Sequence, residues 1–267
     1  MNFNPEDILS QKQIDFTEKL HENISLIIHV NNYCNLKCEY CKYSKIKEKE
    51  KRKEINIKIL NRILNDFKYL SEIHKLPLNV SLLGGEIYVY DKIDELMDTI
   101  YKSKINNILI LSNLTLPEKI IKYHKNNFNY IFTFHSTQMK DNIFIKHLEK
   151  LMSQISSKNI KVKLFFNNEK IEEFCKENNI KIMWGDLDFE NYKNIFESKN
   201  KVIRKCYSIN FNYIYNELFI RHVCKNKIIK LSEIRKIDIK KFIIVCDEIC
   251  PCDELEYCIK KEYKVIK

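Results

Sequence analysis

Short apolar runs alternate with longer stretches of helical periodicity through most of this chain, and this alternation restricts its fold more than any other feature. The runs are rich in isoleucine, leucine, valine and phenylalanine, which predicts buried strands. Between them, apolar residues recur at spacings of three and four, as in Leu60, Ile63 and Leu64. Parallel strands need crossover connections of this length, so the pattern predicts an α/β fold with a parallel sheet. The six predicted strands cover residues 24–30, 78–83, 107–112, 130–134, 161–166 and 180–184.

The number of strand–helix units indicates an incomplete barrel. A full eight-unit barrel takes about 250 residues, whereas the six units here end near residue 185 of 267. We therefore expect a partial (β/α)6 TIM-type barrel over residues 24–188. An N-terminal helical extension over 1–23 precedes it, and a small cysteine-rich α+β extension over 189–267 follows it.

Charge and composition restrict the setting in which the protein works. The net charge is +10, but the lysines are spread along the chain and the densest run, 45–54, alternates in sign. This favours solvated surfaces, and we do not expect a nucleic-acid partner. The N-terminus lacks the pattern of a secretion signal, and no apolar run is long enough to span a membrane. A cytoplasmic location is therefore expected, where ten cysteines indicate metal binding more than disulfides.

Three cysteines follow the first predicted strand within eight residues: Cys34, Cys38 and Cys41. Thiolates are soft ligands for zinc and for iron–sulfur clusters. A zinc site or a cluster held only by protein needs four ligands. Three close cysteines therefore imply either a distant fourth ligand or an iron with an open position.

This Cys-x3-Cys-x2-Cys pattern, with the aromatic Tyr40 before its last cysteine, resembles the core motif of the radical S-adenosylmethionine (radical SAM) enzymes. The resemblance implies a 4Fe–4S cluster held by Cys34, Cys38 and Cys41, whose fourth iron binds S-adenosylmethionine. It also implies reductive cleavage of that cofactor to a 5'-deoxyadenosyl radical, which abstracts a hydrogen atom from the substrate. Tyr40 is expected beside the adenine.

A second motif, Gly84-Gly85-Glu86, ends the second predicted strand and contains two of the three glycines in the chain. Glycines at a strand end are also typical of a plain tight turn. Radical SAM enzymes carry Gly-Gly-Glu at this place, and the resemblance implies that it holds the methionine amino group of the cofactor. Ile87 stands where the family usually has proline.

Polar residues at two further strand ends are candidates for cofactor binding. Ser112 and Asn113 follow the third predicted strand, and His135 follows the fourth. The resemblance implies that such residues face the methionine, ribose or substrate. A turn or strand cap would also account for them.

The C-terminal region breaks the alternation and contains six cysteines, which are Cys206, Cys224, Cys246, Cys250, Cys252 and Cys258. Residues 211–220 form two short strand-like runs that meet near Asn216, which predicts a hairpin. A cysteine before a hairpin, one after it and a later group resemble a reduced SPASM/twitch extension.

That resemblance implies an auxiliary iron–sulfur cluster. Its preferred ligands are Cys206 and Cys224, with two or more of Cys246, Cys250 and Cys252. Cys258 is then spare, and Cys175 is expected in the core. A structural zinc site built from the same thiolates stays open.

Together these features predict a radical SAM oxidoreductase. Its expected partners are S-adenosylmethionine, a reductant such as flavodoxin or ferredoxin, and a substrate for which a peptide is the first candidate class. The alternatives are a sugar, nucleotide or RNA substrate, or a zinc-stabilised binding protein that is not an enzyme.

Overall fold

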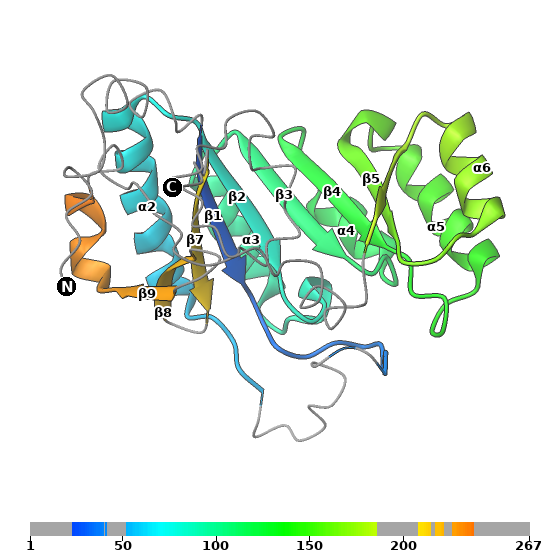
Figure 1. Cartoon of the computed structure of the whole chain (residues 1–267), viewed down its shortest axis with the longest axis horizontal. Helices are drawn as coiled ribbons and strands as arrows, with labels where there is room; N and C mark the ends of the chain where they lie inside the picture. Colours follow the sequence, from blue (N-terminus) through cyan, green and yellow to red (C-terminus); the bar gives the residue numbers. More distant parts are fainter. Residues whose placement is uncertain are drawn as a thin grey trace, which may run out of the picture.

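A nine-stranded sheet organises the computed structural model, which describes residues 23–39, 41, 52–185, 208–214, 217–221 and 226–237 (Figure 1). The strand order is β6-β5-β4-β3-β2-β1-β7-β8-β9. Strands β1 to β7 pair in parallel, whereas β8 and β9 are added antiparallel. The strands are β1 (Asn23–His29), β2 (Leu78–Leu83), β3 (Asn107–Ser112), β4 (Phe128–Thr133), β5 (Ile160–Leu164), β6 (Lys181–Trp184), β7 (Ser208–Ile214), β8 (Glu217–Arg221) and β9 (Asn226–Ile229).

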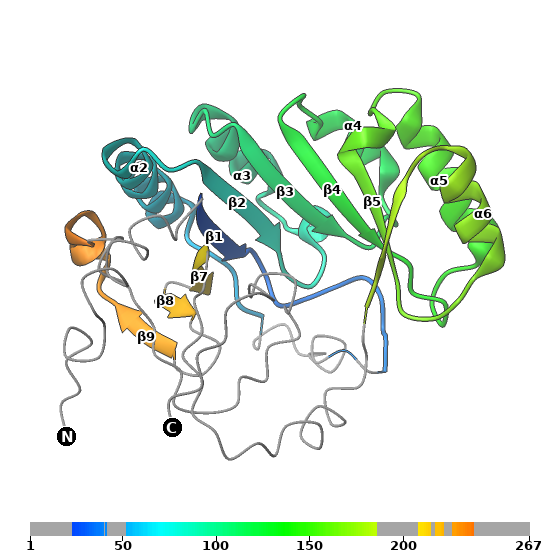
Figure 2. The same ribbon diagram turned by 45° about the horizontal axis from the view of Figure 1, so that its top comes forward.

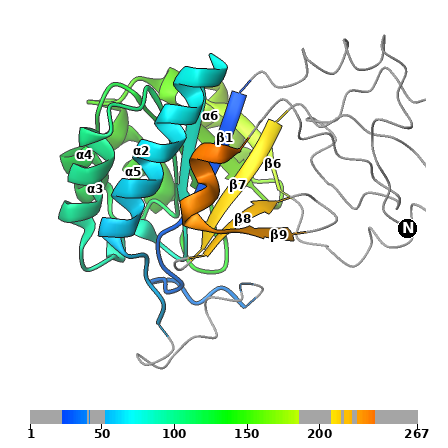
Figure 3. The same ribbon diagram turned by 90° about the vertical axis from the view of Figure 1, so that its left-hand side faces the viewer.

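The helices cover one face of this sheet (Figures 1 and 3). Side chains alternate across a strand, and in β1 the residues Ile24, Leu26 and Ile28 are fully buried while their neighbours are partly exposed. The buried series packs against helices, which supplies most of the core. The helices are α2 (Ile57–His74), α3 (Ile93–Lys102), α4 (Pro117–Tyr123), α5 (Asp141–Met152) and α6 (Glu169–Glu177).

Local sequence accounts for where several helices begin. The Asn56 side chain accepts hydrogen bonds from Lys58 N and Ile59 N, which satisfies free donors in the first turn of α2. Asn168 caps α6 by accepting from Ile171 N at 3.1 Å. Pro117 occupies the first turn of α4, where its missing N–H costs no helical hydrogen bond.

The predicted partial barrel is confirmed, because six parallel strands alternate with helices and the sheet ends at β6 and β9 without closing (Figure 2). The predicted hairpin is also present, with Ile214 of β7 opposite Glu217 of β8. The structure adds that β7 pairs in parallel with β1, so the hairpin continues the main sheet. Phe211 of β7 packs edge-on against Phe67 of α2, with ring centroids 4.6 Å apart.

Several predictions fall outside the described residues. They are the N-terminal helical extension up to residue 22, Tyr40, and the C-terminal cysteines Cys206, Cys224, Cys246, Cys250, Cys252 and Cys258. The predicted boundaries at 23/24 and 188/189 stay predictions. Among the helices that the structure describes, none is both long and apolar enough to cross a bilayer.

Candidate cluster and cofactor site

The turn Gly84-Gly85-Glu86 lies directly against the segment that follows β1. Gly85 N donates to the carbonyl of Asn31 at 3.0 Å, and Glu86 N donates to the carbonyl of Tyr33 at 3.0 Å. A Cβ on Gly84 would collide with Asn31, and one on Gly85 with the Tyr33 carbonyl. Both glycines are therefore needed for close approach of two backbones, and neither has a positive φ.

Asn31 holds this junction from the other side. Its side chain is fully buried, and its Nδ2 donates to the carbonyl of Glu86 at 2.9 Å. Its Oδ1 also accepts from Gly85 N at 3.2 Å. The ends of β1 and β2 are thereby fixed together, which brings the cysteine segment beside the Gly-Gly-Glu turn.

The Glu86 carboxylate is the buried centre of the site, with 1% of the residue exposed. It accepts from Tyr88 N at 3.1 Å, from Ser112 Oγ at 3.0 Å and from Asn113 N at 2.7 Å. Burial nevertheless raises the pKa of Glu86 to about 7, because these hydrogen bonds offset only part of the lost solvation. A cation placed beside this carboxylate would lower its pKa and favour the charged form.

Asn113 links the glutamate to the cysteine segment. Its Nδ2 donates to Cys34 Sγ at 3.4 Å and to Asn35 Oδ1 at 3.0 Å. Its Oδ1 accepts from the hydroxyl of Thr115 at 2.6 Å, and Asn35 Nδ2 donates to that same hydroxyl at 2.7 Å. The amide is therefore held from both ends, and its orientation toward the sulfur is fixed.

The surroundings of Cys34 fit a thiolate that binds iron. Its sulfur accepts from Leu36 N and from Asn113 Nδ2, both at 3.4 Å. Two donors pointing at one sulfur stabilise negative charge on it, and hydrogen bonds to sulfur are a feature of iron–sulfur sites. Burial raises the pKa of the Cys34 thiol to about 11, but a coordinated metal deprotonates a thiol outright.

The other two cysteines continue the same segment. Cys38 is buried and Cys41 is half-buried, and Cys41 N donates to the Cys38 carbonyl at 3.0 Å. Among the residues that the structure describes, no three cysteine, histidine, aspartate or glutamate side chains are gathered as a metal site. The ligand set Cys34, Cys38 and Cys41 stays a prediction, and its donor chemistry suits a 4Fe–4S cluster.

His135 lies at the end of β4, one strand beyond Ser112 and Asn113. Its ring lies 6.4 Å from that of Phe165, and burial lowers the pKa of His135 to about 4. Its carbonyl accepts from Gln138 N at 2.9 Å, and Gln138 Oε1 accepts from Lys37 N at 3.1 Å. The His135 turn thus supports the cysteine segment through Gln138.

The structure brings together most of the predicted site residues that it describes. Glu86, Ser112, Asn113 and Cys34 share one hydrogen-bond network, as the predicted positions at adjacent strand ends implied. Sequence reasoning missed Asn31, Asn35, Thr115 and Gln138. The only local signal was that each is a polar residue in a loop after a strand.

Comparison with known proteins decides the family. Residues 28–162 match the model described as the Radical SAM superfamily, just over half of the 267 residues. The chain belongs to the radical SAM superfamily. The matched region contains the cysteine motif, the Gly84–Glu86 turn and Asn113. Membership implies an iron–sulfur enzyme that uses S-adenosylmethionine, and no curated protein matches the chain.

One solved structure with bound S-adenosylmethionine shares the fold, and two others are less similar. Streptococcus suis SuiB bound to S-adenosylmethionine matches with a TM-score of 0.50 and 15% identity, over 86% of this chain and 67% of that one. SuiB bound to its precursor peptide SuiA gives 0.47 and 20%, over 75% and 49%. Escherichia coli coproporphyrinogen III oxidase gives 0.36 and 14%, over 78% and 48%. The chain thus spans about half to two thirds of these proteins, and the likeness shows the fold alone.

Proposed function

We propose that this protein is a radical SAM oxidoreductase that abstracts a hydrogen atom from a peptide substrate. The observation that carries the proposal is the buried network joining Glu86, Asn113 and Cys34. It puts one carboxylate, one oriented amide and the first cysteine of the motif side by side. Such a site offers a negative group for the cofactor's ammonium next to a thiolate for the cluster.

Each residue has a proposed role in binding or orientation. Cys34, Cys38 and Cys41 hold the cluster, and Glu86 in its ionised form accepts hydrogen bonds from the methionine amino group. Ser112 and the backbone N–H of Asn113 fix the orientation of the Glu86 carboxylate by donating hydrogen bonds to it. Asn113 Nδ2 supports the Cys34 thiolate, and Tyr40 flanks the adenine. His135 contributes a neutral ring at the substrate side of the site.

The reduced cluster, when bound, supplies the electron that cleaves S-adenosylmethionine to a 5'-deoxyadenosyl radical. The protein's part is to orient the cofactor and to keep water and competing hydrogen donors away. A flavodoxin or ferredoxin is the proposed source of the electron.

The peptide class is supported by the open sheet, which ends at β6 on one side and at β9 on the other. An open barrel side admits an extended chain, which a closed barrel would exclude. SuiB, whose fold this chain shares, has been solved with its precursor peptide. A sugar or nucleotide metabolite and RNA are the alternative substrates.

We also propose that Cys206 and Cys224, with two or more of Cys246, Cys250 and Cys252, hold an auxiliary iron–sulfur cluster. The number and spacing of these cysteines support it. After anaerobic purification, two clusters correspond to roughly seven or eight irons per chain. A colourless protein that contains zinc would instead support the non-enzymatic binding module.

The main test compares two cysteine variants. Cys38→Ala should abolish 5'-deoxyadenosine formation from S-adenosylmethionine with dithionite, because the cluster loses one of its three ligands. Cys175→Ala is the matched control, since Cys175 is a buried thiol on α6, away from the motif. It should keep the activity. Continued product formation by Cys38→Ala would contradict the assignment of the site.

A further inference from the structure

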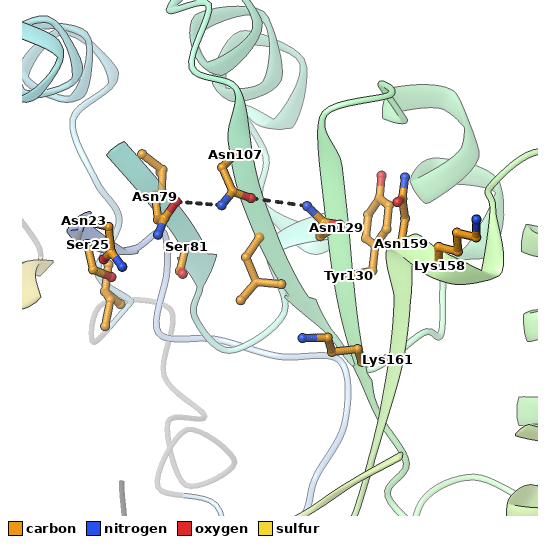
Figure 4. A pocket seen from close by; sticks show the side chains of 13 residues that line it. Asn23, Ser25, Asn79, Ser81, Asn107, Asn129, Tyr130, Lys158, Asn159 and Lys161 are labelled. Carbon is orange, nitrogen blue, oxygen red and sulfur yellow. Dashed lines mark hydrogen bonds between the residues drawn. The ribbon is translucent and has the colours of Figure 1, made fainter. Parts of the chain in front are cut away.

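The face of the sheet opposite the helices contains a pocket of about 450 Å³ toward the N-terminal ends of β1 to β5. Its floor is formed by polar side chains from neighbouring strands (Figure 4). They include Ser25, Asn79, Ser81, Asn107, Asn129 and Lys161. The volume lies within the range of small-molecule sites, roughly 300–1,000 Å³.

This polar floor is unusual for its position. The interior of a TIM-type barrel is normally filled by branched apolar side chains. Here the interior positions nearest the strand starts are polar in all five strands, beginning with Asn23, Asn79, Asn107, Asn129 and Lys161. On the same side of the sheet, the apolar residues Leu109 and Ile27 come later, two residues after Asn107 and four residues after Asn23. The strand sequences therefore specify a polar band across the sheet.

Three of these side chains form an ordered amide ladder (Figure 4). Asn107 Nδ2 donates to Asn79 Oδ1 at 2.6 Å, and Asn129 Nδ2 donates to Asn107 Oδ1 at 3.3 Å. Within the ladder, Asn79 uses only its oxygen, so its two N–H donors are available to the pocket. The ladder fixes these donors in advance, which lowers the entropy cost of binding a ligand.

The charge of the lining indicates what the pocket accepts. Lys161 extends from β5 across the sheet toward the strands that carry the ladder (Figure 4). Lys158 also lines the pocket, and among the described residues that line it there is no aspartate or glutamate. A site with ammonium, amide and hydroxyl donors and no carboxylate favours an anion.

We propose that this pocket binds a small molecule bearing a phosphate or carboxylate group. Lys161 supplies the counter-charge, and Asn79, Ser25 and Ser81 supply hydrogen bonds. The pocket is distinct from the cofactor site. The Glu86 carboxylate accepts from Ser112, the last residue of β3, whereas the pocket is lined on β3 by Asn107 and Leu109 near its start. The proposal does not depend on the proposed reaction.

The test is calorimetric titration of inorganic phosphate, and separately of succinate, into the full-length protein with its cluster reconstituted. We expect saturable binding of at least one probe, which also identifies the acidic group preferred. Asn79→Asp keeps the acceptor for Asn107 but replaces N–H donors with a negative oxygen, so binding should fall at least about tenfold. Lys161→Gln removes the counter-charge and should cause a similar loss.

Lys146→Gln is the matched control, because Lys146 is an exposed lysine on α5 and not among the lining residues. It should bind the probe like the wild type. All variants must first show an unchanged circular dichroism spectrum and unchanged iron content. Three results would overturn the proposal: no saturable binding of either probe, wild-type affinity in Asn79→Asp or Lys161→Gln, or displacement of the probe by S-adenosylmethionine.

Discussion

Hydrogen bonds from three separate chain segments meet at Glu86. Its carboxylate accepts from Tyr88, Ser112 and Asn113, and its backbone bonds to Asn31 and Tyr33. Besides its proposed role in binding the cofactor, Glu86 connects the ends of β1, β2 and β3. Its ionisation and its neighbouring glycines are therefore expected to affect folding and binding together.

Gly85→Ala should destabilise the protein by about 1–3 kcal/mol, because the new Cβ collides with the Tyr33 carbonyl and the two backbones must separate. Urea unfolding measures the loss. Gly185→Ala is the matched control, since the three atoms nearest to its Cβ would be side-chain atoms of Lys163 and Phe165 and not backbone. An equal or smaller loss in Gly85→Ala than in Gly185→Ala would show that the close approach is not required.

The pH dependence of stability should report the buried Glu86. Its pKa is raised from 4.5 to about 7 in the folded protein, so the folded state keeps a proton that the unfolded state releases. The resulting stabilisation is fully present below pH 4.5 and is lost as the pH rises through about 7. It amounts to about 3 kcal/mol at most.

Urea unfolding at a series of pH values measures this contribution. Glu86→Gln should remove it, so that the difference in unfolding free energy between wild type and variant changes across this window. Glu177→Gln, at an exposed position on α6, should leave the profile of the wild type unchanged. Parallel profiles for wild type and Glu86→Gln would mean that folding does not raise the pKa of Glu86.

At the scale of elements, the last described segment is attached to the helical layer through α2. The 3-10 helix η7 (Leu231–Lys236) follows β9, and Arg235 Nε donates to Asp66 Oδ1 at 2.5 Å. The Asp66 side chain is only 7% exposed, and the Arg235 guanidinium also lies 5.0 Å from the Tyr69 ring centroid. A buried carboxylate on α2 thus fixes η7 against the helix.

Arg235→Ala should lower the free energy of unfolding by about 1–2 kcal/mol, since Asp66 loses its shorter ionic contact while staying buried. Arg62→Ala is a natural control. Arg62 lies 3.7 Å from the same carboxylate but one helical turn away on the exposed surface, where such pairs contribute less than about 0.5 kcal/mol. Urea unfolding compares the two. Equal effects would contradict a specific role for the contact between η7 and α2.

Over the described residues, the molecule is an open sheet whose helices all lie on one face (Figures 2 and 3). The Glu86 network lies at the C-terminal ends of the strands, and the polar pocket lies toward the strand starts. The network and the pocket therefore lie at opposite ends of the strands, and they use opposite sides of β3. In a closed barrel the same interior would be packed with apolar side chains.

Local periodicity was enough to predict the strands and helices of residues 24–184. The predicted strands 78–83 and 107–112 coincide with β2 and β3, because alternating burial and helical spacing are properties of neighbouring residues. The parallel order of these strands followed from the length of their connections. The cysteine motif and Gly84-Gly85-Glu86 were visible because their residues are close in sequence.

Other features depend on residues that are distant in sequence. Asn35 meets Thr115 across 80 positions, and Arg235 meets Asp66 across 169. The residues of the β7–β8 hairpin likewise do not determine whether it forms a separate unit or pairs with β1. The pairing depends on which free sheet edge lies beside the hairpin in the folded protein. The sequence by itself determined the elements, their parallel order and the chemistry of the site's residues. Only the tertiary structure decided which loops touch, because hydrogen bonds between strand ends depend on how the sheet brings those ends together.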